Sequence, residues 1–94
     1  MIEFEWDPQK AAANVRKHGV SFQEAATVFA DLLSITAPDP DHSSAENRSI
    51  IVGMSNRGRL LIVAHMERGD RVRIISAREL TRAERKAYEE ETQR

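Results

Sequence analysis

Three strand-like segments separated by short glycine-containing turns constrain the fold of this chain more than any other feature. The segments are "RSIIVGMS" (48–55), "RLLIVAHME" (59–67) and "RVRIISAR" (71–78), and the separators are "NRG" and "RGD". Apolar and β-branched runs joined by tight turns are typical of neighbouring antiparallel strands. The second half of the chain is therefore expected to form an antiparallel β-meander.

The N-terminal segment predicts a short strand followed at once by a helix. Residues 2–6 alternate apolar and acidic side chains, as a strand does. Asp7 can cap the helix that follows, Pro8 suits its first turn, and Gly19 fits the position just past its end. We therefore expect a helix between Asp7 and Gly19.

Two further helices are indicated by capping-box spacing. Ser21 and Glu24 stand three residues apart before a run of apolar residues, which predicts a second short helix. Thr81 and Glu84 repeat this spacing and predict a polar C-terminal helix with a thin apolar stripe. Between these regions, "LLSITAP" (32–38) is read as another strand, and residues 38–47 as an acidic, flexible connection.

Length and composition predict one α+β domain over residues 1–94, with the helices packed on the meander. The chain has no cysteine, which excludes disulfides and thiolate metal sites. The N-terminus lacks the pattern of a signal peptide, and no segment is apolar enough to span a bilayer. A cytoplasmic location without membrane association is expected.

Charge is distributed unevenly along the chain. Residues 1–47 contain 3 basic and 8 acidic side chains, whereas residues 48–94 contain 11 basic and 7 acidic ones. Of the 14 basic residues, 11 are arginine, whose planar guanidinium binds phosphate through two hydrogen bonds. The second half therefore has the side chains to bind phosphate, although any single arginine is more often only a solvated surface residue.

Side-chain alternation predicts how the last two strands pair. In 59–67 one face is entirely apolar (Leu60, Ile62, Ala64, Met66), so we expect it to be the core face. A three-residue turn would then pair Glu67 with Arg71 and His65 with Arg73. We expect this turn because a two-residue turn would put Arg73 on the buried face, where its charge would be costly. The predicted result is a solvent-exposed polar patch that also includes Arg59.

Such a patch has the groups needed to cleave RNA without a metal. A base must remove the proton of the 2′-hydroxyl, an acid must protonate the leaving 5′-oxygen, and arginines can stabilise the negative charge that grows on the phosphate. His65 or Glu67 could be the base and His65 the acid. The same residues could equally form an ordinary cross-strand ion pair, which is the more frequent case for this pattern alone.

Two other groups are weaker candidates. "DPDH" (39–42) brings carboxylates near an imidazole and could bind a divalent ion, but acidic loops usually bind none. Lys17 and His18 end the first predicted helix, where cations complement the helix dipole. They could also border an RNA site if that helix end lies against the sheet.

Taken together, the opening block "FEWDPQKAAANVRKHGVSFQEAATVFAD", the "PDPDH" loop, the meander "RGRLLIVAHMERGDRVRIISARE" and the block "TRAERKAYEE" resemble the BrnT family of type II toxins. The resemblance covers about residues 2–90. It implies a RelE-like fold and a ribonuclease that needs no cofactor and inhibits translation. The implied partners are an antitoxin of the BrnA type, which binds the toxin and the DNA of their shared promoter, and an RNA substrate, either free or on the ribosome.

The resemblance also implies which residues act. Carried over by position, the functional set contains Lys17, His18, Glu67, Arg73 and Arg78. Together with the predicted patch, this gives His65, Glu67, Arg73 and Arg78 as candidate catalytic residues, and Lys17, His18, Arg59 and Arg71 as candidate RNA-binding residues. No metal ligand is expected. The alternatives are a non-catalytic binding module and a degenerate toxin that acts as a co-repressor with its antitoxin.

Overall fold

A computed structural model describes residues 2–40 and 48–92 of the chain. Its elements are, in chain order, β1 (Glu3–Glu5), α1 (Pro8–His18), α2 (Phe22–Thr27), the 3-10 helix η1 (Val28–Ala30), β2 (Ile35–Pro38), β3 (Arg48–Met54), β4 (Leu60–Arg68), β5 (Arg71–Glu79) and α3 (Arg82–Thr92). Each predicted helix and strand is present, with small differences in its ends. The α+β class is confirmed.

The five strands form one mixed sheet in the order β1-β5-β4-β3-β2. β3, β4 and β5 pair antiparallel to one another in chain order, which confirms the predicted meander. β2 adds to β3 antiparallel, whereas β1 lies parallel to β5. β1 pairs only with Arg71 to Arg73, so among the described residues no strand pairs with the later part of β5 on that side.

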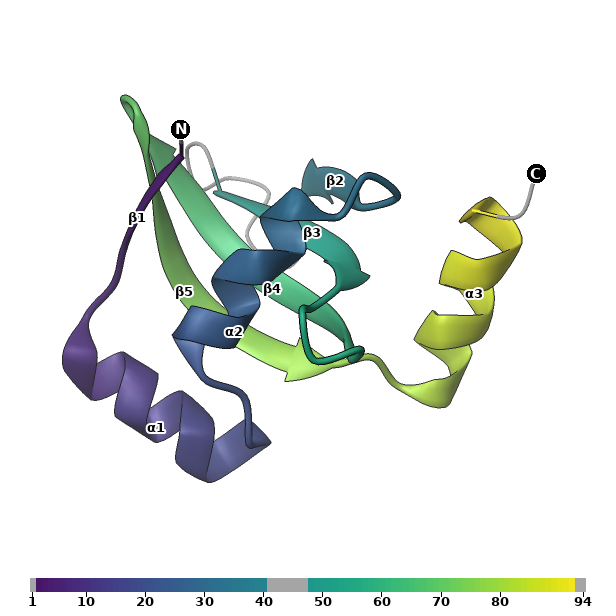
Figure 1. Cartoon of the computed structure of the whole chain (residues 1–94), viewed down its shortest axis with the longest axis horizontal. Helices are drawn as coiled ribbons and strands as arrows, with labels where there is room; N and C mark the ends of the chain where they lie inside the picture. The colour runs from purple at the N-terminus through teal and green to yellow at the C-terminus, as the bar shows by residue number, and fades with distance from the viewer. Residues whose placement is uncertain (1, 41–47, 93–94) are drawn as a thin grey trace.

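The core lies mainly between one face of the sheet and α2, which lies in front of that face in Figure 1, whereas α1 lies beside the β5 edge of the sheet. It is built from aliphatic side chains and one phenylalanine: Val20, Phe22, Ala25, Val28, Ile51, Leu61, Val63, Ile74 and Ala77. The opposite face carries α3 at one end, and no residue between Arg82 and Thr92 is buried. We call this second side the open face of the sheet.

Local signals account for the ends of α1. The Asp7 carboxylate accepts a hydrogen bond from the backbone N–H of Gln9 at 2.8 Å, and Pro8 occupies the first turn. Gly19 ends the helix with φ 68°, a left-handed conformation in which a side chain would be strained. Its N–H donates to the carbonyl of Val15 at 2.8 Å.

The two predicted capping boxes differ in one respect. The Ser21 hydroxyl accepts a hydrogen bond from the N–H of Glu24 at 3.0 Å, but the Glu24 side chain does not return to Ser21. At α3 the exchange is reciprocal: the Glu84 N–H donates to the Thr81 hydroxyl at 3.2 Å, and the Thr81 N–H donates to the Glu84 carboxylate at 2.8 Å. Glu24 is therefore available for another partner.

The predicted turn between β4 and β5 is wrong by one residue. Arg68 pairs with Arg71, which leaves Gly69 and Asp70 as a two-residue turn. Gly69 has φ 65° and occupies the first central position, where a type II′ turn favours glycine. The prediction rejected this turn because it would place Arg73 beside Met66, which was assigned to the core.

That core assignment is also wrong. The face of β4 that lies towards the core carries Leu61, Val63 and His65, which are 0%, 0% and 2% exposed. The imidazole of His65 stacks edge-on against Phe29 with ring centroids 4.9 Å apart, and its Nδ1 lies 3.3 Å from the Val63 carbonyl oxygen. An aromatic neighbour and a nearby carbonyl thus allow burial of a side chain that the prediction left in solvent. No helix among the described residues is long and apolar enough to cross a membrane.

Candidate functional site

The residues predicted to form one catalytic patch lie in separate places. His65 is buried beneath the helices, and Glu67 pairs with Val72 near the exposed end of the same strand. Arg73 pairs with Met66 on the open face, so it projects on the opposite side of the sheet from His65. Burial lowers the pKa of His65, although the Val63 carbonyl and the charge of Glu67 act against this. The predicted convergence of these side chains is therefore not found.

Arg59, predicted to bind RNA, is half-buried and forms an ion pair with the buried carboxylate of Glu24. Its Nε donates to the Glu24 carboxylate at 2.9 Å, its Nη2 donates to the other oxygen of the same carboxylate, and Nη2 also reaches the Gly19 carbonyl at 3.1 Å. The Ser55 hydroxyl donates to Glu24 at 2.7 Å. These contacts, with Arg59 first, lower the pKa of the Glu24 carboxyl. Arg59 therefore joins the end of α1, α2 and the β3-β4 turn.

The arginines at the start of β5 meet the carboxylates of β1. The Nη1 of Arg73 donates to Glu5 at 3.1 Å, and the Nε of Arg71 lies 3.5 Å from Glu3. Arg68 is a third cation in this cluster, with its Nη1 3.6 Å from Glu5. The hydrogen bond from Arg73 is the main cause of the lowered pKa of Glu5. Three guanidinium groups for two carboxylates leave this cluster with net positive charge.

A pocket of about 230 Å³ lies where the open face meets the C-terminal end of α1. Three basic side chains from three elements line it: His18 from α1, Arg48 from β3 and Arg78 from β5. The rest of its lining is one carboxylate, one hydroxyl and an apolar floor, formed by Asp39, Ser76, Ile50, Ile62, Ala64 and Ala77. We call it the basic pocket. It brings together two of the predicted residues, His18 and Arg78.

The short length of β1 explains how α1 reaches this pocket. Because β1 ends its pairing at Arg73, the edge of β5 around Ala77 is left for α1. The side chain of Asn14 occupies that edge: its amide donates to the Ala77 carbonyl at 2.8 Å and accepts from the Ala77 N–H at 3.1 Å. One helical turn later, His18 lies beside Arg78 in the lining of the pocket.

Arg48 and Asp39 were not predicted as members of a site with His18 and Arg78. The Nε of Arg48 lies 3.4 Å from a carboxylate oxygen of Asp39, and the two side chains are 23% and 6% exposed. Asp39 was considered only as part of an acidic loop, and Arg48 only as the start of a strand. Their position follows from β2 and β3 lying side by side, a non-local pairing that the sequence pattern did not reveal.

Arg78 is also joined to α3. Its Nη1 and Nη2 donate to the two carboxylate oxygens of Glu84 at 2.7 and 3.0 Å. These hydrogen bonds, followed by that from the Thr81 backbone, lower the pKa of Glu84 to about 2. Glu84 is therefore ionised throughout the neutral range, and its charge opposes that of Arg78.

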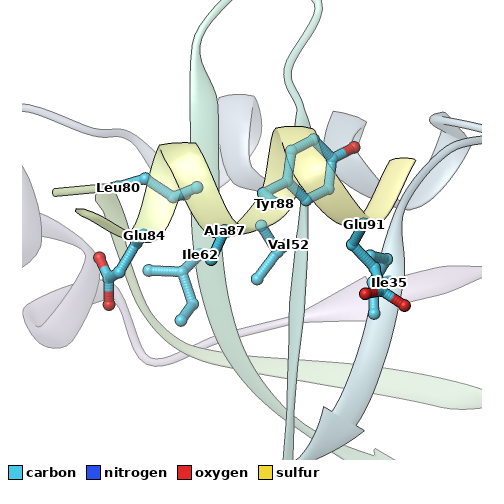
Figure 2. Close-up of a pocket in the computed structure, with 8 residues that line it drawn as sticks. All are labelled: Ile35, Val52, Ile62, Leu80, Glu84, Ala87, Tyr88 and Glu91. Atoms are coloured by element: carbon cyan, nitrogen blue, oxygen red, sulfur yellow. The ribbon is translucent and has the colours of Figure 1, made fainter. Parts of the chain in front are cut away.

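Lys17 and the apolar groove under α3 complete the surroundings of the basic pocket. Lys17 is exposed in the last turn of α1 and does not line the pocket. Beyond Glu84, a groove of about 320 Å³ runs between α3 and the sheet. Figure 2 shows Ala87 and Tyr88 of α3 above Ile62 and Val52. The Tyr88 hydroxyl donates to the Leu33 carbonyl at 3.0 Å, which holds the far end of α3.

The acidic loop suggested as a metal site includes Asp39, Asp41 and His42. Asp41 and His42 lie outside the described residues. Within residues 2–40 and 48–92, no group of three or more His, Cys, Asp or Glu side chains is arranged to hold a metal ion.

The fold and the basic pocket define a small α+β protein in which arginines of the open sheet face and a histidine of α1 meet in a pocket suited to an anionic ligand. Residues 6–84 match the family described as the ribonuclease toxin BrnT of type II toxin-antitoxin systems, and the chain belongs to this family. This confirms the resemblance recognised in the sequence. Membership in a type II toxin-antitoxin family implies an antitoxin partner.

Comparison with solved structures supports the fold. The structure is similar to the crystal structure of the Brucella abortus ribonuclease toxin BrnT, with a TM-score of 0.69 and 21% sequence identity. The similarity covers 87% of this chain and 100% of that one. Comparison with curated protein sequences gave no match.

Proposed function

We propose that this chain is a metal-independent endoribonuclease that cleaves RNA in the basic pocket and thereby inhibits translation. The observation that carries the proposal is the meeting of His18, Arg48 and Arg78 in one concave site. An imidazole can transfer a proton, and guanidinium groups can bind a phosphate through paired hydrogen bonds. Membership in a family of ribonuclease toxins supports RNA as the substrate.

The proposed reaction requires no group beyond those of the pocket and the RNA. The 2′-oxygen loses its proton and attacks the adjacent phosphorus, while the bond from phosphorus to the 5′-oxygen breaks. The products are a 2′,3′-cyclic phosphate and a free 5′-hydroxyl. In this proposal the His18 imidazole accepts the 2′ proton and gives it to the leaving 5′-oxygen, so no net proton is gained or lost. Arg78 and Arg48 stabilise the charge that grows on the non-bridging oxygens.

The arginines at the start of β5 have a separate role in this proposal. Side chains alternate between the two faces along β5, which alone would put Arg78 on the opposite face from Arg71 and Arg73. The bulge inserts one extra residue between them, so all three arginines project on the open face. Four residues lie between Arg73 and Arg78, and their partners Met66 and Ile62 on β4 are four residues apart, a distance of roughly 13 Å at 3.3 Å per residue. We therefore assign Arg73 to holding RNA beside the cleaved bond, at a different phosphate from the one that Arg78 would bind.

The partner of the toxin is proposed to be an antitoxin of the BrnA type, which binds the protein directly and represses the shared promoter. Contact with DNA would then occur only through the antitoxin. A short neighbouring gene for a basic, helical DNA-binding protein would support this arrangement. Co-purification of its product with this chain would test it.

The function is tested by incubating the purified protein with RNA, with and without ribosomes, and in the presence of a chelator. We expect cleavage that survives the chelator and leaves cyclic phosphate ends. Arg78→Ala should reduce the rate by about 100-fold, as does loss of one donor to a transition-state oxyanion. His18→Ala should reduce it by at least about 100-fold. Arg85→Ala, on the exposed side of α3, is the matched control and should leave the rate unchanged.

Three outcomes would contradict the proposal. Intact RNA in every condition would exclude cleavage, and RNA binding without cleavage would support a non-catalytic binding module. DNA binding only together with an antitoxin, again without cleavage, would support a degenerate toxin that acts as a co-repressor.

A further inference from the structure

Asn14 is a buried polar residue that the proposed mechanism does not use. It is 6% exposed, and three hydrogen bonds satisfy its side-chain amide. Nδ2 donates to the Val20 carbonyl at 2.9 Å and to the Ala77 carbonyl at 2.8 Å, and Oδ1 accepts from the Ala77 N–H at 3.1 Å. Both amide donors and the carbonyl oxygen of Asn14 are thus directed to two backbone segments.

Those two segments adjoin the residues of the basic pocket. Val20 follows the turn that begins directly after His18, and Ala77 immediately precedes Arg78. Asn14 itself lies one helical turn before His18 on α1. One amide therefore ties the helix that carries the histidine to the strand that carries the arginine.

Within residues 2–40 and 48–92, no backbone hydrogen bond joins this edge of β5 at Ala77 to another strand. β1 pairs with β5 only as far as Arg73, so at Ala77 the strand edge meets a side chain where a sheet would supply another strand. The amide of Asn14 offers one donor and one acceptor to that edge, as a paired strand residue does. These two hydrogen bonds fix the position of α1 both along β5 and perpendicular to it.

We propose that Asn14 is a positioning residue that holds the His18 imidazole at the distance from Arg78 that RNA cleavage requires. This rests on the proposed function of the basic pocket. A polar residue that served only to fill the core would not need to bond to the neighbours of both pocket residues. Because catalytic geometry must be held within a fraction of an ångström, loss of the tie affects the chemical step more than substrate binding.

The test compares Asn14→Ala and Asn14→Ser with Ile51→Val, a variant on β3 that loses one methylene group in the core and does not line the pocket. In folded Asn14 variants we expect kcat to fall by about 10- to 100-fold with KM changed by less than about threefold. Ile51→Val should keep both constants. The second readout is the NMR resonance of the His18 ring, which should move in the Asn14 variants and stay in place in Ile51→Val.

The outcomes separate this inference from the proposed function. If the wild type cleaves RNA but a folded Asn14 variant keeps its kcat and its His18 resonance, the inference is overturned. If both Asn14 variants fail to fold while Ile51→Val folds, the role is structural and the inference is again overturned. If the wild type cleaves nothing, the proposed function fails. The positioning role of Asn14 is then tested by the response of the His18 resonance to added inorganic phosphate. A response in the wild type that is reduced in Asn14→Ser would keep the positioning role, and an equal response would overturn it.

Discussion

The carboxylate of Glu84 accepts hydrogen bonds from both terminal nitrogens of the Arg78 guanidinium, at 2.7 and 3.0 Å. Arg78 lines the basic pocket, whereas Glu84 belongs to the first turn of α3, a helix without buried residues. The same guanidinium edge that would bind a phosphate is thus already bonded to an anion. A phosphate that enters the pocket has to compete with Glu84.

Replacing Glu84 should therefore strengthen RNA binding. In Glu84→Gln the competing charge is absent, and a partly exposed ion pair is worth up to about 1 kcal/mol, which corresponds to about fivefold in affinity. We expect KM for RNA to fall by up to that factor, measured in a cleavage assay at fixed salt. Glu89→Gln changes the net charge equally but lies away from Arg78, so it should leave KM unchanged. An unaltered KM in Glu84→Gln would show that the ion pair does not restrict the pocket.

Acid should detach α3 before it unfolds the core. The pKa of Glu84 is lowered from 4.5 to about 2 in the folded protein, so its ion pair stabilises α3 fully above pH 4.5. That contribution is lost as the pH falls from about 4.5 towards 2, where the carboxyl takes up its proton. The amide resonances of α3 should report a transition in this range. Glu84→Gln should lack it, and a transition of equal size in that variant would assign the effect to another group.

The helices and strands could be predicted because their signals are local. Asp7 and Gly19 mark the ends of α1 through contacts with residues at most four positions away. The glycine-containing turns identify the meander for the same reason. Such contacts depend little on the rest of the chain, and the structure confirms them.

The register could not be predicted, because it depends on which face the helices cover. The apolar set around Ile62 was chosen as the core face, but the core lies on the face of Leu61 and Val63. The free-energy cost predicted for placing Arg73 beside Met66 then does not arise, because β1 lies next to β5 and supplies Glu5 as the partner of Arg73. Parallel pairing of the first strand with the last is a non-local feature that side-chain alternation does not encode.

Only part of the basic pocket could be predicted, because its composition also depends on non-local packing. His18 and Arg78 were identified by resemblance, but Arg48 and Glu84 were not assigned to the site. Their roles depend on how β2, β3 and α3 are placed around β5. The sequence pattern identified basic residues that could bind RNA, but only the three-dimensional arrangement determines which of them lie close together.

Burial of His65 should make folding sensitive to mild acid. Desolvation lowers the pKa of the folded imidazole below its ordinary value of 6.5, so the unfolded chain binds a proton more readily than the folded one. Stability from this site is therefore complete above pH 6.5 and decreases as the pH falls below it. His65→Leu removes the titrating group. The difference in urea midpoint between pH 7.5 and pH 5 should be smaller in the variant than in the wild type, and an equal difference would contradict the assignment.

Arg59 should contribute to stability because its partner is buried. The Glu24 side chain is 3% exposed, and without Arg59 its carboxylate would keep little more than the Ser55 hydroxyl and a distant Arg57. Removing one member of a buried pair typically costs about 3 kcal/mol or more, so Arg59→Ala should lower the free energy of unfolding by roughly that amount in urea titrations. Arg57→Ala is the matched control, since that side chain is 72% exposed and its Nη1 lies 3.9 Å from Glu24.

The double variant Glu24→Gln with Arg59→Ala separates charge from packing. It removes the buried carboxylate together with its partner, so it should be more stable than Arg59→Ala alone. If Arg59→Ala costs no more than Arg57→Ala, the ion pair does not stabilise the fold. Arg59 would then again be a candidate for binding RNA, as the sequence predicted.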